Sequence, residues 1–157
     1  MNYAPRWLND EEQGFWRQYL AAANKIDRVI DDSLHSNGAL SAPEYAVMVA
    51  LSEAEGRQLR LRELCTELNW DRSRTSHQIT RMEKRGFVAK EKSEGDARGV
   101  MVSLTDEGMR RLEEAVPEHV ETVRRLIFDH LDPQDVPALQ RFFTNVLAVN
   151  SIPSEEK

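Results

Sequence analysis

The sequence predicts a mainly α-helical protein with one small β-hairpin. Three observations favour this fold class. Apolar residues recur at intervals of three and four over most of the chain, two short stretches have the composition of strands, and capping residues, glycines and prolines lie where the periodic stretches end. The 157 residues, 40% of them apolar, suit one compact domain with additional helices.

The first helix is expected over residues 10–34, because apolar residues form one broad face along it. Asp10, with Gln13 three residues later, fits the start of this helix, and the pair Asn37-Gly38 fits its end. The residues of the apolar face are Phe15, Tyr19, Ala22, Ala23, Ile26, Val29, Ile30 and Leu34.

The second helix has a complete start signal. Ser41 can cap it, Pro43 suits its first turn, and Glu44 can complete a capping box with Ser41. The apolar pattern of this helix ends near Glu55. A third, short helix is expected over residues 59–69, where leucines again recur at intervals of three and four.

The fourth helix and the hairpin follow directly. Asp71 is expected to cap a helix over residues 72–85, and Gly86 closes that helix in the position that favours a left-handed residue. Residues 87–91 and 100–104 have strand composition, and a polar loop with two glycines separates them.

The last part of the chain is helical again. Thr105 can cap a long helix in which Pro117 predicts a kink and not a break, because the apolar pattern continues on both sides of it. Asp132 and Pro133 predict the start of the last helix, and residues 151–157 are expected to fray.

The middle of this order, two helices joined by a short turn and followed by a hairpin, is that of a winged helix-turn-helix lobe. We therefore divide the chain into an N-terminal dimerisation helix (1–39), a winged helix-turn-helix lobe that binds DNA (40–104), and C-terminal dimerisation helices with a tail (105–157). The first and last parts carry more apolar surface than a small winged lobe can bury, and a two-fold dimer would cover it.

The charge is unevenly distributed along the chain. The net charge is -6, but residues 57–98 hold eleven basic and seven acidic side chains. Residues 1–56 hold four basic and nine acidic side chains, and residues 99–157 hold six and eleven. A local basic surface is what binding to phosphates requires, although a solvated basic face would have the same composition.

The helix over residues 72–85 has one inward face and one polar face. Its inward residues are Thr75, Ile79 and Met82; its outward residues are Ser73, His77, Thr80 and Lys84; and its flanks hold Arg72, Arg74, Ser76, Gln78, Arg81 and Arg85. Arginine can pair with guanine and glutamine with adenine, while hydroxyls and lysine can anchor phosphates. An ordinary solvated helix is the alternative, but the short helix before it and the hairpin after it favour DNA binding.

The predicted wing carries Lys90 and Lys92 before its tip and Asp96-Ala97-Arg98 after it. A carboxylate two residues before an arginine can hold the guanidinium in one pose, from which it can enter a narrow minor groove. The alternative is a weak surface ion pair between Asp96 and Arg98.

An ordered set of motifs resembles the multiple-antibiotic-resistance regulator (MarR) family. The motifs are Leu61-Arg62-Glu63-Leu64, the stretch from Asp71 to Val88, Asp96-Ala97-Arg98, and the stretch from Val102 to Gly108. The resemblance covers about residues 40–108. It implies a homodimeric winged-helix transcription factor, usually a repressor, that binds pseudopalindromic DNA and dimerises through its N- and C-terminal helices.

The resemblance also implies which residues meet DNA. Residues of the fourth helix would enter the major groove, and Arg98 would enter the minor groove with Asp96 orienting it. Together with the face analysis, the predicted DNA-binding residues are Arg72, Ser73, Arg74, Ser76, His77, Thr80, Arg81, Lys84, Asp96 and Arg98.

Members of this family often leave DNA when they bind small phenolic or acidic molecules. By resemblance, the pocket lies where the dimer helices meet the DNA-binding lobe. Our candidates for it are Trp16, Tyr19, His35, Tyr45 and Met48, although aromatic residues at helical spacing are more often core residues. No cofactor and no metal site are expected, since the four histidines have no mutual ligand spacing.

The only cysteine, Cys65, excludes an intramolecular disulfide and a multi-cysteine zinc site. It lies on an inward face, which predicts an inert buried thiol, and a cysteine-based redox-sensing regulator of the same fold is the alternative.

An enzyme is not expected, because the chain has no glycine-rich phosphate loop and no nucleophile motif. A protein-interaction module that has lost DNA binding is a further alternative, which the basic helix and Arg98 oppose. Neither a secretory signal nor a membrane-spanning stretch is expected, so the prediction is a cytoplasmic protein.

Overall fold

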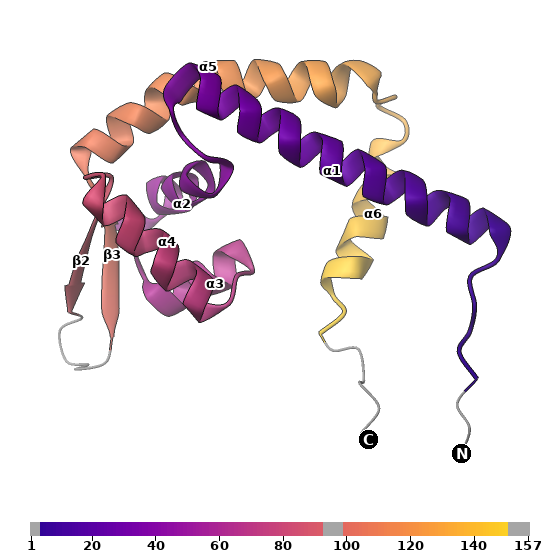
Figure 1. Cartoon of the computed structure of the whole chain (residues 1–157), viewed down its shortest axis with the longest axis horizontal. Coiled ribbons are helices and arrows are strands. Elements are labelled where there is room, and N and C mark those ends of the chain that lie inside the picture. Colours follow the sequence, from indigo (N-terminus) through magenta and orange to yellow (C-terminus); the bar gives the residue numbers. More distant parts are fainter. Residues whose placement is uncertain (1–3, 93–98, 151–157) are drawn as a thin grey trace. The chain divides into compact units, whose positions relative to one another are not determined.

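The computed structural model describes residues 4–92 and 99–150, and it is mostly helical with one small sheet (Figure 1). The elements in chain order are α1 (Asp10–Gly38), α2 (Ala42–Glu53), the 3-10 turn η1 (Glu55–Arg57), β1 (Gln58–Arg60), α3 (Leu61–Leu68), α4 (Arg72–Lys84), β2 (Val88–Lys92), β3 (Val100–Leu104), α5 (Asp106–Leu126), the 3-10 turn η2 (Phe128–His130) and α6 (Val136–Leu147). The chain forms two compact units, Met1–Thr122 and Val123–Lys157.

The first unit contains the predicted winged helix-turn-helix. Helices α3 and α4 follow one another across a short turn, and the antiparallel strands β2 and β3 pack beside α4 (Figure 1). Side chains of α2, α3, α4, β2, β3 and α5, with Leu34 of α1, form the core, and Val47, Leu64 and Val102 are fully buried in it. The predicted fold class, mainly α with a winged helix-turn-helix lobe, is confirmed.

The sheet has a third strand that the sequence did not predict. Strand β1 pairs with β3 so that Leu59 lies opposite Val102, and the sheet order is β1-β3-β2. The predicted short helix included Leu59 and Arg60, but α3 begins only at Leu61. A strand of three residues has too few positions for a period of two to be visible, and its pairing partner is remote in sequence.

The helix caps follow the sequence at three places. Ser41 Oγ accepts a hydrogen bond from the Glu44 backbone, and the Glu44 carboxylate accepts one from the Ser41 backbone, so the predicted capping box is present. Asp71 Oδ1 accepts a 2.8 Å hydrogen bond from the Arg74 backbone, and Thr105 Oγ1 accepts one of 3.0 Å from Gly108.

Two helix starts differ from the prediction. Asn9 caps α1 in a box with Glu12, one residue earlier than the predicted Asp10, because its amide oxygen reaches the Glu12 backbone at 2.8 Å. Helix α6 begins at Val136 and not at Pro133. The Asp132 carboxylate accepts the Gln134 N–H at 2.9 Å and closes a separate turn, so the helix begins after that turn with Pro137 in its first turn.

Helix α5 is continuous through Pro117, as its apolar periodicity predicted. The predicted division of the chain into three functional parts remains a prediction. Among the described residues, no helix combines the length and apolar character needed to cross a membrane.

Candidate nucleic-acid interface

Helix α4 exposes the polar face that its sequence predicts. Thr75, Ile79 and Met82 are fully buried, which fixes the rotation of the helix on the core. Thr80 is half-buried at the edge of the opposite face. The other predicted contact residues of α4 are exposed to solvent: Arg72, Ser73, Arg74, Ser76, His77, Arg81 and Lys84. The geometry therefore brings these side chains to one surface.

The single carboxylate of α4 is held by the wing. Glu83 accepts a 3.0 Å hydrogen bond from the Lys90 backbone, and the Lys90 ammonium lies 3.6 Å from the same carboxylate. The ammonium also donates to Thr80 Oγ1 at 3.3 Å. Because Lys90 neutralises Glu83, the face of α4 that meets solvent is predominantly positive.

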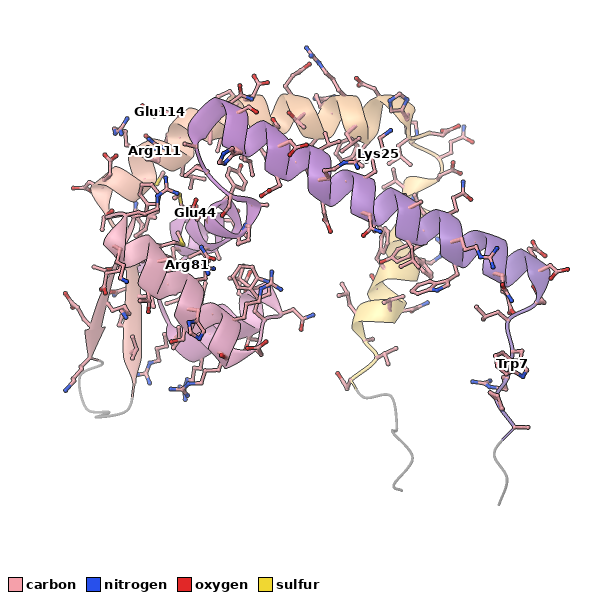
Figure 2. The ribbon with its side chains drawn as sticks, in the orientation of Figure 1. Trp7, Lys25, Glu44, Arg81, Arg111 and Glu114 are labelled. Carbon is pink, nitrogen blue, oxygen red and sulfur yellow. The ribbon has the colours of Figure 1, made fainter. Side chains whose placement is uncertain are left out.

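Two arginines of α4 have fixed surroundings. The Arg74 guanidinium lies 4.2 Å from the centroid of the Trp70 ring, a cation–π contact at the start of the helix. Arg81 projects from α4 (Figure 2) and donates a 2.6 Å hydrogen bond to Gln78 Oε1. Gln78 itself is only 4% exposed, so the sequence-based suggestion that this glutamine pairs with adenine is wrong.

The wing tip falls outside the described residues. Asp96 and Arg98 belong to the segment 93–98, so their assignment to the minor groove remains a prediction. The described part of the wing, β2, ends with Lys90 and Lys92 exposed to solvent.

The five predicted effector residues lie at separate places in the first unit. Trp16 and Tyr19 stack on α1 with ring centroids 5.6 Å apart, and both are exposed. His35 is exposed near the end of α1, in a hollow that Arg111 and Glu114 of α5 also line. Met48 is fully buried in the core. The structure of one chain does not bring these residues together, and the effector pocket remains a prediction.

Tyr45 packs against a residue that the sequence did not single out. The rings of Tyr45 on α2 and His119 on α5 lie 4.3 Å apart, and His119 Nδ1 is buried without a hydrogen-bond partner among the described residues. Burial lowers the pKa of His119 and raises the pKa of Tyr45. A single histidine in a charged helix has no sequence pattern that would have predicted this contact.

Cys65 is partly exposed, contrary to the predicted burial. It lines a hollow with Arg60, Arg62 and Arg72. Within the described ranges, no group of three histidine, cysteine, aspartate or glutamate side chains is arranged to hold a metal ion.

Both units expose apolar side chains. In the first unit most of these lie along the start of α1 and the segment before it: Trp7, Leu8, Phe15, Trp16, Tyr19 and Leu20, all at least 40% exposed. In the second unit they lie on α6: Leu139, Phe142, Phe143, Val146 and Leu147. Apolar faces of this extent are typical of interaction surfaces.

Comparisons with known proteins agree with this architecture. A family model described as transcriptional regulator SarA/Rot matches residues 30–115. Sco3205, a MarR family transcriptional regulator from Streptomyces coelicolor solved in complex with DNA, shares 38% identity with a TM-score of 0.88, and the match covers 97% of this chain and 95% of that one.

Two further relatives extend the comparison. AbsC, a MarR family transcriptional regulator from Streptomyces coelicolor, shares 36% identity with a TM-score of 0.86 over 91% of this chain and 96% of its own. The regulator PecS from Dickeya dadantii is 30% identical over 103 residues, which are 65% of this chain and 61% of PecS. The chain thus spans less than two thirds of PecS.

Proposed function

Because this chain belongs to the MarR family of transcriptional regulators, we propose that it is a cytoplasmic homodimer that binds a pseudopalindromic operator and represses transcription from it. The exposed face of α4 is the observation that carries the proposal. On that face basic and hydroxyl side chains stand together, and the only carboxylate is neutralised by Lys90. Such a face complements the acceptor-rich floor and the phosphate walls of a major groove.

In this proposal the residues of α4 divide into two roles. Arg74 and Arg81 offer planar forks to guanine, and His77 lies between them on the outward face. The side chains that position the helix against phosphates are Arg72, Ser73, Ser76, Thr80 and Lys84. Arg98, oriented by Asp96, would enter the adjacent minor groove.

The dimer follows from the apolar faces of α1 and α6. Two copies related by a two-fold axis would cover these faces with an isologous interface. The two α4 helices would then lie about 34 Å apart and reach successive major grooves on one side of the duplex.

Release from DNA requires a second state of the dimer. A small phenolic or acidic effector that binds near Trp16, Tyr19, His35 and Tyr45 would favour a dimer in which the spacing of the α4 helices does not fit the operator. Such an effector acts only by its differential affinity for the two states.

The test is to recover the genomic fragments that the purified dimer binds and to footprint the enriched site. We expect a pseudopalindrome with half-sites one helical turn apart. Arg98→Ala should weaken binding to that site and leave the dimer intact, whereas Arg110→Ala, which removes an equal charge from the outer surface of α5, should not. Failure to enrich any duplex would identify the chain as a protein-interaction module, and unchanged binding by Arg98→Ala would refute the role of the wing.

A screen for small molecules that dissociate the operator complex follows from the same assay. Phenolic and acidic compounds should be enriched among the active molecules. Substitution of Trp16 or Tyr45 should reduce their effect without reducing operator binding in their absence.

A further inference from the structure

The connection between α1 and α2 is a tight corner. Helix α1 ends with Ala39 in the left-handed conformation, at φ 50°, and the Ala39 N–H donates to the carbonyls at the end of the helix. The Leu40 N–H donates to the Leu34 carbonyl at 3.3 Å, and both leucines are buried. Helix α1 is therefore joined to the lobe that carries α4 by a short, hydrogen-bonded connection.

One arginine ties the end of α4 to this corner. Arg85, the C-cap residue of α4, donates from Nη1 to Glu44 Oε1 at 2.6 Å and from Nη2 to the Ala39 carbonyl at 2.9 Å. Its guanidinium also lies 4.6 Å from the centroid of the Phe87 ring. A single planar group thus contacts the end of α1, the first turn of α2 and the start of the wing.

Both carboxylate oxygens of Glu44 are hydrogen-bonded at this corner. Its side chain is 8% exposed, and its second oxygen accepts the Ser41 N–H at 2.9 Å. A buried carboxylate without its cation is strongly unfavourable, so the charge of Glu44 requires Arg85 to stay where it is. The geometry is also directional, because two guanidinium nitrogens address two acceptors at fixed positions.

A second arginine reaches the same corner from another helix. Arg111 of α5 donates to the Gly38 carbonyl, one residue before the acceptor of Arg85, and its guanidinium lies 5.6 Å from the Phe87 ring centroid. Further along, the Asp31 carboxylate accepts the Ala42 N–H at 2.8 Å. Leu34 is the one residue of α1 that is fully buried, so polar contacts at its C-terminal end provide much of the directional attachment of this helix.

We propose that Arg85, paired with Glu44, is the positioning residue that fixes the pose of α4 relative to α1 and so sets the half-site spacing that the dimer accepts. The inference rests on the proposed function, in which α1 belongs to the dimer interface and α4 enters the groove. Apolar packing alone is non-directional and tolerates small rotations of a helix. The guanidinium of Arg85, held by two acceptors, does not tolerate such a rotation. A small rotation at the corner would produce a larger displacement at the far end of α1.

The dependence of affinity on half-site spacing tests this role of Arg85, because a residue that only stabilised the fold would not change that dependence. Inserting one base pair between half-sites displaces one of them by about 3.4 Å and rotates it about the duplex axis. The wild-type dimer should lose operator affinity at least about tenfold on an insertion or deletion of one base pair, the cost of a seriously mismatched contact. Arg85→Lys keeps the charge beside Glu44 but replaces the two terminal guanidinium nitrogens with a single ammonium nitrogen. This variant should therefore bind all three spacings within about threefold of one another.

Arg110→Gln is the matched control. Arg110 lies on α5 next to Arg111, but it is exposed, and its ion pairs in the described part of the chain lie within its own helix, with Glu107 at 2.7 Å and Glu114 at 2.6 Å. This variant should keep the wild-type preference for spacing. If Arg85→Lys retains that preference as well, or if Arg110→Gln loses it equally, the inference is wrong.

A measurement without DNA separates this inference from the proposed function. Spin labels on Ser73→Cys in a Cys65→Ser background report the distance between the two α4 helices of the free dimer. The parent should give one narrow distance distribution, Arg85→Lys a broader one, and Arg110→Gln the narrow one. Glu44→Gln, which keeps an acceptor for Arg85, serves if Arg85→Lys is poorly folded, and it should also broaden the distribution. Equal widths in all variants would overturn the positioning role even if the wild type binds its operator.

Discussion

Arg81 donates a 2.6 Å hydrogen bond to Gln78, one turn earlier on α4, and Gln78 is almost wholly buried. The exposed side of α4 therefore contains an arginine whose guanidinium is oriented from beneath by an amide that cannot itself reach a base. In the proposed complex, Gln78 would act on DNA only through Arg81.

Gln78→Leu should weaken operator binding by about 0.5–1 kcal/mol, less than is usual for a hydrogen bond to a charged group, because Arg81 is solvent-exposed. The preference for the base that Arg81 contacts should relax at the same time. Anisotropy titrations against single-base operator variants measure both. In an Arg81→Ala background the Gln78 substitution should have no further effect, and a full additional loss there would refute the indirect role.

Gly108→Ala should destabilise the fold severely. A β-carbon at this position of α5 would lie 2.2 Å from the Phe87 carbonyl oxygen and 2.7 Å from Leu104 Cδ1. The backbone of α5 or β2 would have to move, so we expect a loss of more than about 2 kcal/mol, as for other overpacked sites. Chemical denaturation measures the loss.

Gly14→Ala is the control for that substitution. Gly14 lies within α1, and a β-carbon there would meet no atom within 4 Å. Alanine should therefore stabilise the chain by about 0.5–1 kcal/mol through helix propensity. If the two substitutions changed the free energy of unfolding equally, α5 would not pack as closely against Phe87 as described.

The free energy of unfolding should depend on the protonation of His119. Burial lowers the pKa of His119 below its ordinary value of 6.5, so the unfolded chain binds the proton more readily than the folded one. The contribution of His119 to stability is complete above pH 6.5 and is lost as the pH falls toward the lowered pKa. His119→Phe keeps a ring against Tyr45 and should remove this part of the pH dependence. Urea titrations between pH 5 and 8 test it, and an unchanged pH profile would contradict it.

Val146→Asp should convert the dimer into a monomer. Val146 is 53% exposed on α6, within the apolar face that the proposed interface covers. A carboxylate placed in such an interface would be desolvated without a partner. Light scattering should show half the wild-type mass, while circular dichroism should show unchanged helix content. Glu118→Asp, a charge-conserving change at an exposed position of α5, should leave the mass unaltered.

Local signals in the sequence predicted much of this fold. The caps Ser41 and Asp71 and the buried stripe of Ile79 and Met82 are short-range features, and each is present as predicted. The polar face of α4 follows from that stripe, because burial of one side of a helix leaves the opposite side exposed.

The features that the sequence did not predict depend on distant partners. Strand β1 exists because Leu59 pairs with Val102 on β3. The pattern of α4 placed Arg85 on a flank, but its carboxylate partner, Glu44, lies 41 residues earlier in the chain. The pattern of α4 placed Gln78 on a flank, beside residues that are exposed, but Gln78 is only 4% exposed because this part of the flank packs on the core.

The dependence of operator affinity on salt tests the central claim most directly. If the positive face of α4 binds duplex phosphates, the logarithm of the association constant should fall with the logarithm of salt concentration at a slope of about -4 or steeper, near -0.9 for each neutralised phosphate. Arg72→Ala and Lys84→Ala should each make that slope shallower by about 0.9, whereas Arg110→Ala should not change it. A flat slope, or one that the α4 substitutions leave unchanged, would contradict the assignment of α4 as the DNA-binding surface.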